Sequence, residues 1–491
     1  MLVSVKNYKM VRVLNTIKAI AKNTIFIFIG QIINILLTYF YTIYTARYLG
    51  AAGFGILSFA IAFTGISGLL ADLGLSLLTT REVSRNNLLA GRYVGNILII
   101  KSILSVITLG FTAIAINLLG YSFKTCLIVY LITFSTIFNS FTGLFNSVFQ
   151  AFQKMEYMSL GIILNSLLIF TGTAFVIYQN LGIFSFAFVY LFASTVTFVY
   201  SLCTIIWRFL IPKLELDLPL WKNLLKESIP FCMTGVFIAI YFRMDIIILS
   251  MMKGEEIVGW YAASYRVIDG LSVIPSAFMS IIFPVFSKYY IDSKKSLELA
   301  FEKSLAFITI IAIPIGVGTM ILSNEIILFI YGNMYLPSAS ALRILIWASV
   351  LGFINLTPAT LLISINKQRT LMIFTFIGAI LNLVLNYLLI PSFSYEGAAV
   401  ATVITELVIG LLMLYEIQKI QNLLNSFLAI VFRSLISAIF MGIFVFTFKN
   451  YTLFLLLPSA SIIYFISLFV VNGIRKDDLN MLNQAWKDRN G

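Results

Sequence analysis

Long apolar stretches follow one another from residue 24 to residue 473, and only short polar segments separate them. Each is about 20 residues long or longer, the length at which an α-helix crosses a hydrocarbon core of about 30 Å. None shows the period-two alternation of a transmembrane β-strand. The pattern therefore predicts an all-α polytopic membrane protein with fourteen spanning helices, at residues 24–46, 53–78, 94–117, 125–147, 157–178, 183–207, 224–250, 257–285, 299–323, 338–364, 370–390, 396–418, 427–447 and 452–473.

Lysine and arginine are distributed unevenly over the segments between these helices. The N-terminal segment, the C-terminal segment and every second connection hold 22 of the 33 basic residues, whereas the other connections hold four. Basic connections stay in the cytoplasm, so we expect a cell-membrane (plasma or inner) protein with both termini cytoplasmic. Because the net charge of +13 is spread over short loops, anionic lipid headgroups are the expected neighbours and nucleic acid is not an expected partner.

Composition narrows the chemistry that the chain can perform. It has no histidine, which excludes a Ser-His-Asp or Cys-His nucleophile, a histidine metal site and an imidazole proton relay. Its three cysteines lack the spacing of a metal site, and no phosphate-binding loop for ATP occurs. The longest extracytoplasmic loop, at 324–337, is too short for the acidic outer domain expected of a membrane glycan polymerase. We therefore expect neither an enzyme nor a cofactor or metal.

Two short motifs recur in the same order in the two halves of the chain. Segments 50–55 (GAAGFG) and 254–259 (GEEIVG) share two glycines at an offset of 204 residues. Segments 152–156 (FQKME) and 365–369 (INKQR) are related by an offset of 213. Six helices per half is an even number, so both halves should have the same orientation, related by a pseudo-twofold axis along the membrane normal.

This repeat divides the chain into two six-helix lobes and two further helices. The predicted segments are a cytoplasmic amphipathic leader at 1–23, an N-lobe at 24–207, a cytoplasmic linker at 208–223, a C-lobe at 224–420, a C-terminal helix pair at 421–474 and a cytoplasmic tail at 475–491.

The chain resembles the polysaccharide-transporter branch of the MOP superfamily, the oligosaccharide or O-antigen flippases related to lipid II flippases and MATE exporters. The basic leader, the helix count and the motifs at 46–55 (ARYLGAAGFG), 152–154 (FQK) and 241–245 (YFRMD) carry this resemblance. It implies two lobes around a cavity that opens alternately to each side, and no covalent chemistry. The implied substrate is a polyprenyl-(pyro)phosphate-linked oligosaccharide, flipped to the outer leaflet for surface polysaccharide assembly, with glycan-assembly proteins as possible partners.

Ionisable residues within the spans are the candidate site residues. Each costs about 2.5 to 3.5 kcal/mol on insertion scales, so it should face a cavity or a partner. Arginine binds phosphate through two parallel charge-assisted hydrogen bonds, and we expect Arg243, in the seventh span, to contact the pyrophosphate. The other candidates for substrate binding are Arg266, Arg47, Arg81, Arg85, Lys101 and Arg343.

Several of these residues have a structural alternative. Arg47 and Arg343 lie close enough to helix ends for their side chains to reach the lipid headgroups. Arg81 and Arg85, one turn apart at the cytoplasmic end of the second span, could receive a phosphate at the inner entrance. The ordinary excess of basic residues on the cytoplasmic side explains them equally well.

Without histidine, a protonation switch would need a carboxylate. Asp245 lies two residues from Arg243 on a different helix face, so the two charges do not cancel, and it is the expected coupling residue. Further coupling candidates are Asp72, Asp269 and Glu406. Asp269 is three residues after Arg266 and could instead neutralise it. Sodium, the membrane potential and the substrate gradient remain alternative energy sources.

Other functions remain open from the sequence. A MATE-like exporter of amphipathic cations or drugs would need an acidic cavity, and the ionisable residues within the spans, four basic and four acidic, do not decide between the two. The motif resemblance favours the flippase. A membrane glycan polymerase or transferase is a third interpretation, which the short outer loops disfavour.

Overall fold

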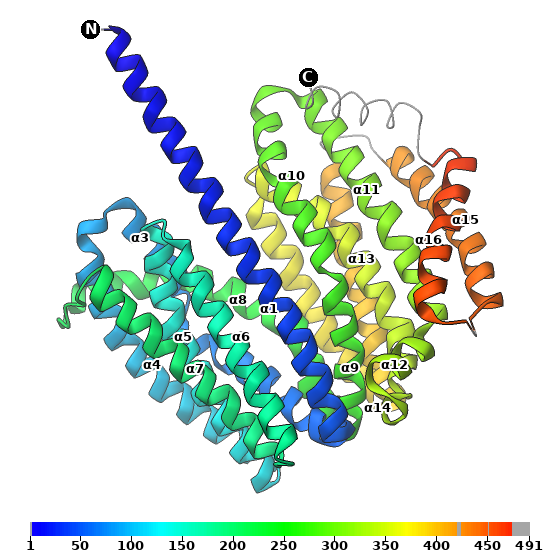
Figure 1. Ribbon diagram of the computed structural model, residues 1–491, viewed down its shortest axis with the longest axis horizontal. Coiled ribbons are helices and arrows are strands. Elements are labelled where there is room, and N and C mark those ends of the chain that lie inside the picture. The colour runs from blue at the N-terminus through cyan, green and yellow to red at the C-terminus, as the bar shows by residue number, and fades with distance from the viewer. Residues whose placement is uncertain (1, 420–423, 450, 474–491) are drawn as a thin grey trace. The chain divides into compact units, whose positions relative to one another are not determined.

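The computed structural model describes residues 2–419, 424–449 and 451–473, shown as ribbons in Figure 1. Every regular element in these ranges is an α-helix or a short 3-10 helix, and none is a strand. The all-α fold predicted from the apolar stretches is therefore confirmed. The predicted cytoplasmic tail at 475–491 lies outside the described residues.

Twelve helices among the described residues are long and apolar enough to cross a membrane. Two of them contain a kink at which the backbone leaves the helical region, namely Gly50 in α1 (Leu2–Ser67) and Ser394 in α14 (Gln368–Gln418). Each of these two helices corresponds to two predicted spans, so the twelve helices account for all fourteen. Helix α1 begins at Leu2, so the predicted leader is continuous with the first spanning helix.

Contacts divide the chain into two units, Met1–Gly259 and Trp260–Gly491. Besides α1, the first unit contains α2 (Leu69–Asp72), α3 (Leu75–Arg85), η1 (Asn87–Leu89), α4 (Ala90–Leu118), α5 (Phe123–Ala151), α6 (Met155–Tyr178), α7 (Ile183–Arg208), α8 (Leu218–Lys253) and the start of α9 (Glu255–Leu271). Besides α14, the second contains the rest of α9, α10 (Val273–Asp292), α11 (Lys294–Ile321), α12 (Ser323–Tyr331), η2 (Asn333–Tyr335), α13 (Ser338–Ser364), α15 (Leu424–Thr447) and α16 (Leu453–Val470).

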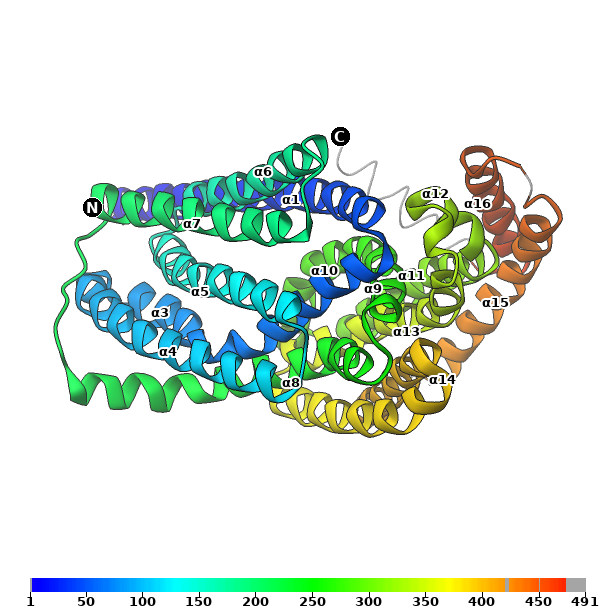
Figure 2. The ribbon, with the colours of Figure 1, turned by 90° about the horizontal axis from the view of Figure 1, so that it is seen from below.

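The first unit is held together by two long helix pairs. Figures 1 and 2 show α1 beside α6 and α5 beside α7, and these are its most extensive contacts. Helix α8 also packs on α1 and α3. A buried apolar cluster of this unit consists of Leu75, Leu78, Val94, Ile97, Ile100, Leu144, Phe145, Val148, Phe149, Ile205 and Leu224.

The predicted linker between α7 and α8 packs on the first turns of α4. A Cβ on Gly95 would lie 1.8 Å from the carbonyl oxygen of Lys213, so the linker backbone approaches α4 where only glycine fits. The backbone N–H of Asp217 donates to Oδ1 of Asn96 at 3.2 Å. Hydrogen bonding from Arg92 holds the pKa of the Asp217 carboxyl below its ordinary value, so this carboxylate stays charged and paired at neutral pH.

In the second unit, α13 packs on α14 and α11, and α15 packs on α11 and α16. Its core includes Met279, Ile308, Phe353 and Tyr464. The Tyr464 hydroxyl donates to the backbone carbonyl of Ile310 at 2.8 Å, which satisfies the only polar atom of this buried side chain.

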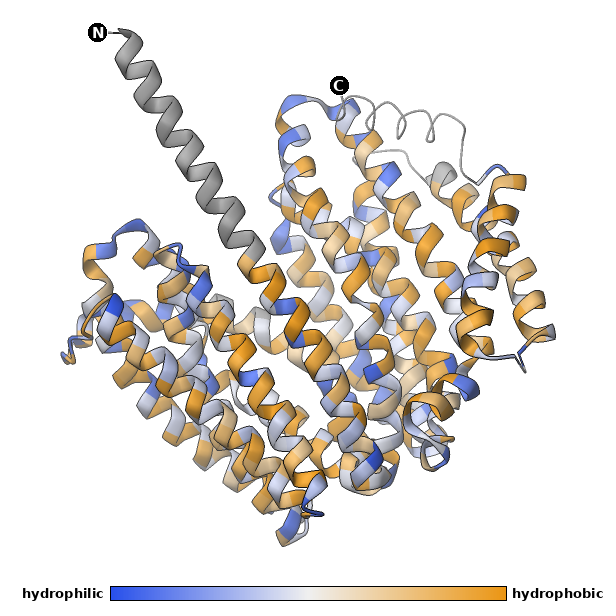
Figure 3. Ribbon diagram, viewed as in Figure 1, coloured by the Kyte–Doolittle hydropathy of each residue, from blue (hydrophilic) through white to orange (hydrophobic). Residues whose placement is uncertain are grey.

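The outward helix faces of both units are apolar. Hydrophobic residues predominate along the helices and hydrophilic residues gather mainly in the connecting segments (Figure 3). Large side chains such as Val106 on α4 and Phe454 on α16 are at least 70% exposed. In water such faces would be unfavourable, whereas a hydrocarbon solvent accommodates them. The chain is therefore a multi-pass membrane protein.

The glycine motif forms the same local structure in both halves. Gly50 has φ 69° and ψ 178°, and Gly254 has φ 89° and ψ 178°, a region that side-chain-bearing residues rarely adopt. The helix that follows each glycine is interrupted at corresponding positions, at Gly68 after α1 and at Ser272 after α9. The offset of 204 residues therefore relates two structural repeats.

The second motif also forms equivalent turns. Gln153 and Asn366 are both left-handed, with φ 55° and 61°. The following residues, Lys154 and Lys367, each donate a backbone N–H to the carbonyl five residues earlier, at 2.8 and 2.7 Å. This hydrogen bond closes a helix in the Schellman manner, so the offset of 213 residues also reflects a repeated structure.

The two glycine motifs touch each other through their backbones. A Cβ on Gly55 would lie 1.7 Å from the carbonyl oxygen of Glu255, and a Cβ on Gly259 would lie 1.9 Å from that of Ala51. The offset of 204 relates Gly55 to Gly259 and Ala51 to Glu255, so each contact is the repeat-equivalent of the other.

We predict that Gly55→Ala destabilises the protein strongly, because the new methyl group meets backbone that cannot rotate away. Overpacking ordinarily costs about 1 to 3 kcal/mol, and a backbone clash of this kind should reach at least the upper end. Gly65→Ala, in the same helix with nothing within 4 Å of the added carbon, is the matched control. Thermal unfolding of both purified variants measures the difference, and equal midpoints would contradict the prediction.

Candidate functional site

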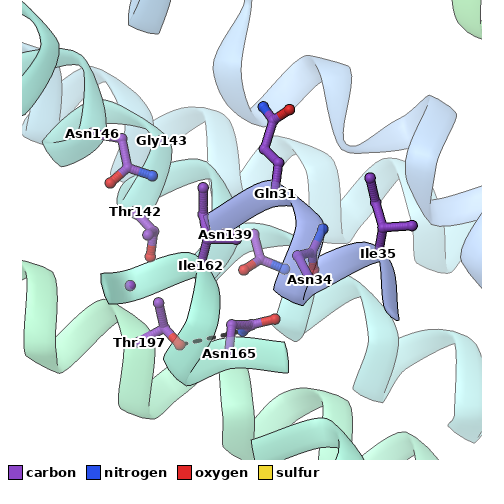
Figure 4. Close-up of a pocket in the computed structure, with 11 residues that line it drawn as sticks. Gln31, Asn34, Ile35, Asn139, Thr142, Gly143, Asn146, Ile162, Asn165 and Thr197 are labelled. Carbon is purple, nitrogen blue, oxygen red and sulfur yellow. Dashed lines mark hydrogen bonds between the residues drawn. The ribbon is translucent and has the colours of Figure 1, made fainter. Parts of the chain in front are cut away.

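A pocket of about 520 Å³ lies among α1, α5, α6 and α7 of the first unit (Figure 4). This volume is in the range of small-molecule sites. Five of the lining side chains are carboxamides, two are threonines and none is ionisable. The lining residues are Gln31, Asn34, Ile35, Asn139, Thr142, Gly143, Asn146, Gly161, Ile162, Asn165 and Thr197.

Hydrogen bonds position part of this lining. Oδ1 of Asn34 accepts from the Ser166 hydroxyl at 2.5 Å, and Nδ2 of Asn165 donates to the Thr197 hydroxyl at 3.3 Å, the dashed line in Figure 4. Oδ1 of Asn146 is buried and has no hydrogen-bond partner among the described residues. Each carboxamide offers two donors and an acceptor, so the pocket keeps hydrogen-bonding capacity for a ligand.

Helical spacing brings these polar residues together. Asn139, Thr142 and Asn146 are separated by three and four residues, so they share one face of α5. Gly143 and Gly161 leave space beside them because they carry no side chain. The sequence-based prediction considered only ionisable residues and missed this face. Neutral polar residues at helical spacing within an apolar span were the signal that could have found it.

Two of the predicted site residues meet in a buried cluster beside this pocket. The side chain of Lys101 on α4 is fully buried, and its Nζ donates to Oδ1 of Asp72 at 2.5 Å. The same nitrogen donates to the backbone carbonyl of Ser140 at 2.7 Å, to its hydroxyl at 2.9 Å and to the Ser76 hydroxyl at 3.3 Å. The pairing that a buried ionisable group requires is thus supplied within the first unit.

The second predicted span differs from the continuous helix expected at 53–78. It is broken after Asp72, where Leu73 (φ 46°) and Gly74 (φ 77°) are left-handed. Broken backbone at membrane depth needs internal partners. The Ser140 hydroxyl donates to the carbonyl of Ala71 at 2.9 Å and supplies one of them.

The arginines at the cytoplasmic end of the second span are paired with carboxylates. Nε of Arg81 donates to Glu82 at 2.7 Å, Arg81 also pairs with Glu227 on α8, and Arg85 donates to Glu82 at 3.1 Å. Arg47 is exposed and lies just before the kink of α1. The predicted substrate roles of these three arginines stay predictions.

In the second unit, Arg266 and Asp269 form the i,i+3 pair of the structural alternative, at 3.4 Å. Arg343 donates from Nε to the Ser323 hydroxyl at 2.7 Å and from Nη2 to Oδ1 of Asn324 at 3.0 Å. It therefore links α13 to the first turn of α12.

The remaining candidates lie on α8 and α14. Arg243 is half-buried and forms no hydrogen bond or ion pair with another described residue. Asp245 is buried, and its Oδ1 accepts from the backbone N–H of Ile246 at 2.8 Å. Oε2 of Glu406 accepts from Nδ2 of Asn355 at 2.8 Å. None of the predicted site residues lines the carboxamide pocket.

Comparison with known families identifies the chain. A family described as polysaccharide biosynthesis protein matches residues 20–290, more than half of the sequence. The chain belongs to the polysaccharide biosynthesis protein family. A second family, MatE, matches residues 230–388, and this agrees with the MOP superfamily resemblance of the sequence motifs.

Relatives and solved structures agree with this assignment. The "Probable low-salt glycan biosynthesis flippase Agl15" of Haloferax volcanii is 27% identical over 391 residues, which are 79% of this chain and 81% of that protein. The lipid II flippase MurJ in an inward closed conformation superposes with a TM-score of 0.76 at 18% identity, covering 92% of this chain and 98% of its own. An inward-facing MATE family transporter superposes with a TM-score of 0.67 at 16% identity, over 80% and 96%. These structures share the fold.

The ionisable candidate residues of this protein thus lie outside the carboxamide pocket. Of the ionisable candidates, Lys101, Arg81, Arg85, Arg266 and Asp269 are in ion pairs within the protein. The pocket instead presents neutral donors and acceptors, and in a low-dielectric site these act without the desolvation cost of a buried charge. Such a lining suits a ligand rich in hydroxyl groups.

Proposed function

We propose that the protein is a flippase that moves a polyprenyl-(pyro)phosphate-linked oligosaccharide from the cytoplasmic to the outer leaflet. The neutral, hydrogen-bonding pocket of the first unit is the observation that carries this proposal. Family membership and the flippase Agl15 of Haloferax volcanii support it.

Sugar units fit this pocket chemically. A hydroxyl group is both donor and acceptor, as are the carboxamides and threonines of the lining. A site built to hydrogen-bond hydroxyls rejects ligands that lack them, because its polar groups would then be left unpaired. The pocket would bind the first sugars of the head, and the apolar outer faces of the helices would accommodate the lipid tail in the bilayer.

Arg243 is our proposed contact for the phosphate groups. The residue is half-buried, and its guanidinium can offer the two parallel donors that a phosphate oxygen pair accepts. Asp245, two residues on, is the proposed protonation switch, which would require its pKa to differ between inward-open and outward-open states. Of the remaining candidates outside the Lys101 and Asp72 pair, the basic ones keep their predicted role in guiding substrate and the acidic ones in coupling.

Export of amphipathic cations is the runner-up function, supported by the MatE match at residues 230–388. A cation site at membrane depth calls for a carboxylate facing the ligand. The eleven residues that line the pocket include none, which favours the uncharged sugar over the cationic drug.

The proposed setting is the plasma or inner membrane with both termini cytoplasmic. Anionic lipids beside the basic loops and proteins of glycan assembly are the proposed partners, and no enzymatic step is assigned to the chain itself.

We predict that Asn146→Leu lowers flipping about tenfold, because a sugar hydroxyl would lose its partner, a loss worth about 1 to 3 kcal/mol. Asn117→Leu, on an exposed face of α4 outside the pocket, is the control. Flipping is measured in proteoliposomes by the access of a membrane-impermeant lectin to a polyprenyl-pyrophosphate-linked oligosaccharide. Wild-type rates for the Asn146 variant would remove the pocket from the transport path.

Arg243→Ala should lower flipping by about 10- to 100-fold, since a charge-assisted hydrogen bond contributes about 1.5 to 3 kcal/mol. Arg243→Lys should restore only part, because the planar fork is lost. The same lectin assay at matched protein content measures both. An alanine variant as active as the parent would exclude Arg243 from the site.

The topology is tested by cysteine labelling in a background without Cys126, Cys203 and Cys232. Lys222→Cys should react with an impermeant maleimide only after the cell is opened, and Lys124→Cys should react from outside. Both positions are exposed. The reverse labelling pattern would overturn the orientation derived from the loop charges.

A further inference from the structure

The Lys101 ammonium occupies a site that resembles the coordination sphere of a small cation. Four oxygen atoms surround it at 2.5 to 3.3 Å: one carboxylate oxygen of Asp72, the carbonyl and hydroxyl oxygens of Ser140, and the hydroxyl of Ser76. Three of these oxygens are neutral and one carries charge. Transporters coordinate monovalent cations at the ends of interrupted transmembrane helices, and Asp72 is the last residue of such a helix, α2.

The internal repeat provides a comparison within the same chain. Residues corresponding to Asp72 and Lys101 at the offset of 204 are Ser276 and Leu305, and Phe353 corresponds to Ser140 at the offset of 213. The second repeat therefore has neither the carboxylate nor the lysine, and no serine in place of Ser140, although Ser276 and Ser280 are serines at the positions of Asp72 and Ser76. Its helix α10 also continues without interruption from Val273 to Asp292. The break after Asp72 and the ammonium thus occur together, in one repeat only.

The cluster is accessible from one side and adjoins the carboxamide pocket on another. The Asp72 side chain is 29% exposed although Lys101 is fully buried, so a small ion could reach the carboxylate. The Ser76 hydroxyl lies 3.5 Å from the point where a Cβ on Gly143 would be, and Gly143 lines the pocket. The occupant of this sphere therefore supports one wall of the pocket.

We propose that Lys101 is a tethered cation, which permanently fills a monovalent-cation site built by Asp72, Ser76 and Ser140 at the break of the second span. The ammonium stabilises the broken helix as a bound ion would, but it cannot dissociate. The first unit of the wild-type protein accordingly needs no soluble ion at this position. Removal of the ammonium leaves an empty oxygen sphere with an unpaired, partly buried carboxylate, which an alkali cation can occupy.

The experiment measures thermal unfolding of the full-length protein in detergent, in sodium, lithium, potassium or choline chloride at equal ionic strength. Lys101→Ala opens the sphere, and we expect sodium or another alkali cation to raise its midpoint by about 2 to 4 °C over choline, with saturation as expected for a bound ligand. Lys101→Met fills the same space without charge and should not respond. The wild-type midpoint should be equal in all four salts.

A double variant, Asp72→Asn with Lys101→Ala, keeps the test decisive if the single variant folds poorly. Removing both charges is often tolerated where removing one is not, so the double variant should fold and show no cation response. Recovery of folded Lys101→Ala by an alkali cation alone supports the proposal. A folded Lys101→Ala that ignores every alkali cation overturns it. The proposal is also overturned if no cation restores folding of Lys101→Ala while the double variant folds. It is overturned as well if alkali cations raise the wild-type midpoint as much as that of Lys101→Ala.

Discussion

The crossing of two glycines is the contact on which the repeated architecture depends. Gly55 and Gly259 let the backbones of α1 and α9 touch, each against the carbonyl of the residue that the repeat makes equivalent. Close backbone approach at small residues is a principal source of helix association in lipid, where apolar side chains gain nothing by leaving the solvent. Gly50 and Gly254, which precede these glycines and have positive φ, set the direction in which the chain enters each helix. One short motif, used twice, thus supplies both sides of this backbone contact in the first unit.

Departures from regular helix need internal partners in a membrane, and this chain supplies them in two ways. At the ends of α5 and α13, in the connections that contain Gln153 and Asn366, a backbone hydrogen bond closes each helix. The break after Asp72 has a network of its own, in which Ser140 bonds the carbonyl of Ala71 and Lys101 bonds Ser140 and Asp72. The burial of a lysine within a span is expensive, and the repeat without the break has no such lysine. We therefore attribute the buried Lys101 charge to the need to stabilise the broken helix after Asp72.

The separation of charges from the pocket bears on how a glycan carrier would be recognised. Half of the eight intramembrane candidates are neutralised by neighbours within their own unit, and the pocket offers only neutral hydrogen-bonding groups. Sugar hydroxyls match such groups, and the phosphates would depend on a side chain elsewhere, for which Arg243 is proposed. The sugar and the phosphate groups of one substrate would then be bound by two different parts of the chain.

The sequence by itself determined the membrane class, the fourteen spans and the repeat. The length of an apolar stretch, and a glycine such as Gly50 at a position of positive φ, are local features that the order of residues shows directly. It also predicted the Arg266 and Asp269 pairing as an alternative, since both lie on one turn. Only the tertiary structure decided that Lys101 contacts Asp72, which lies on a different helix. Only the structure also showed that the second span is broken directly after Asp72. It likewise decided that carboxamides from α1, α5 and α6 share one pocket. These depend on which helix faces meet, and long-range packing between similarly apolar helices leaves no local signal in the order of residues.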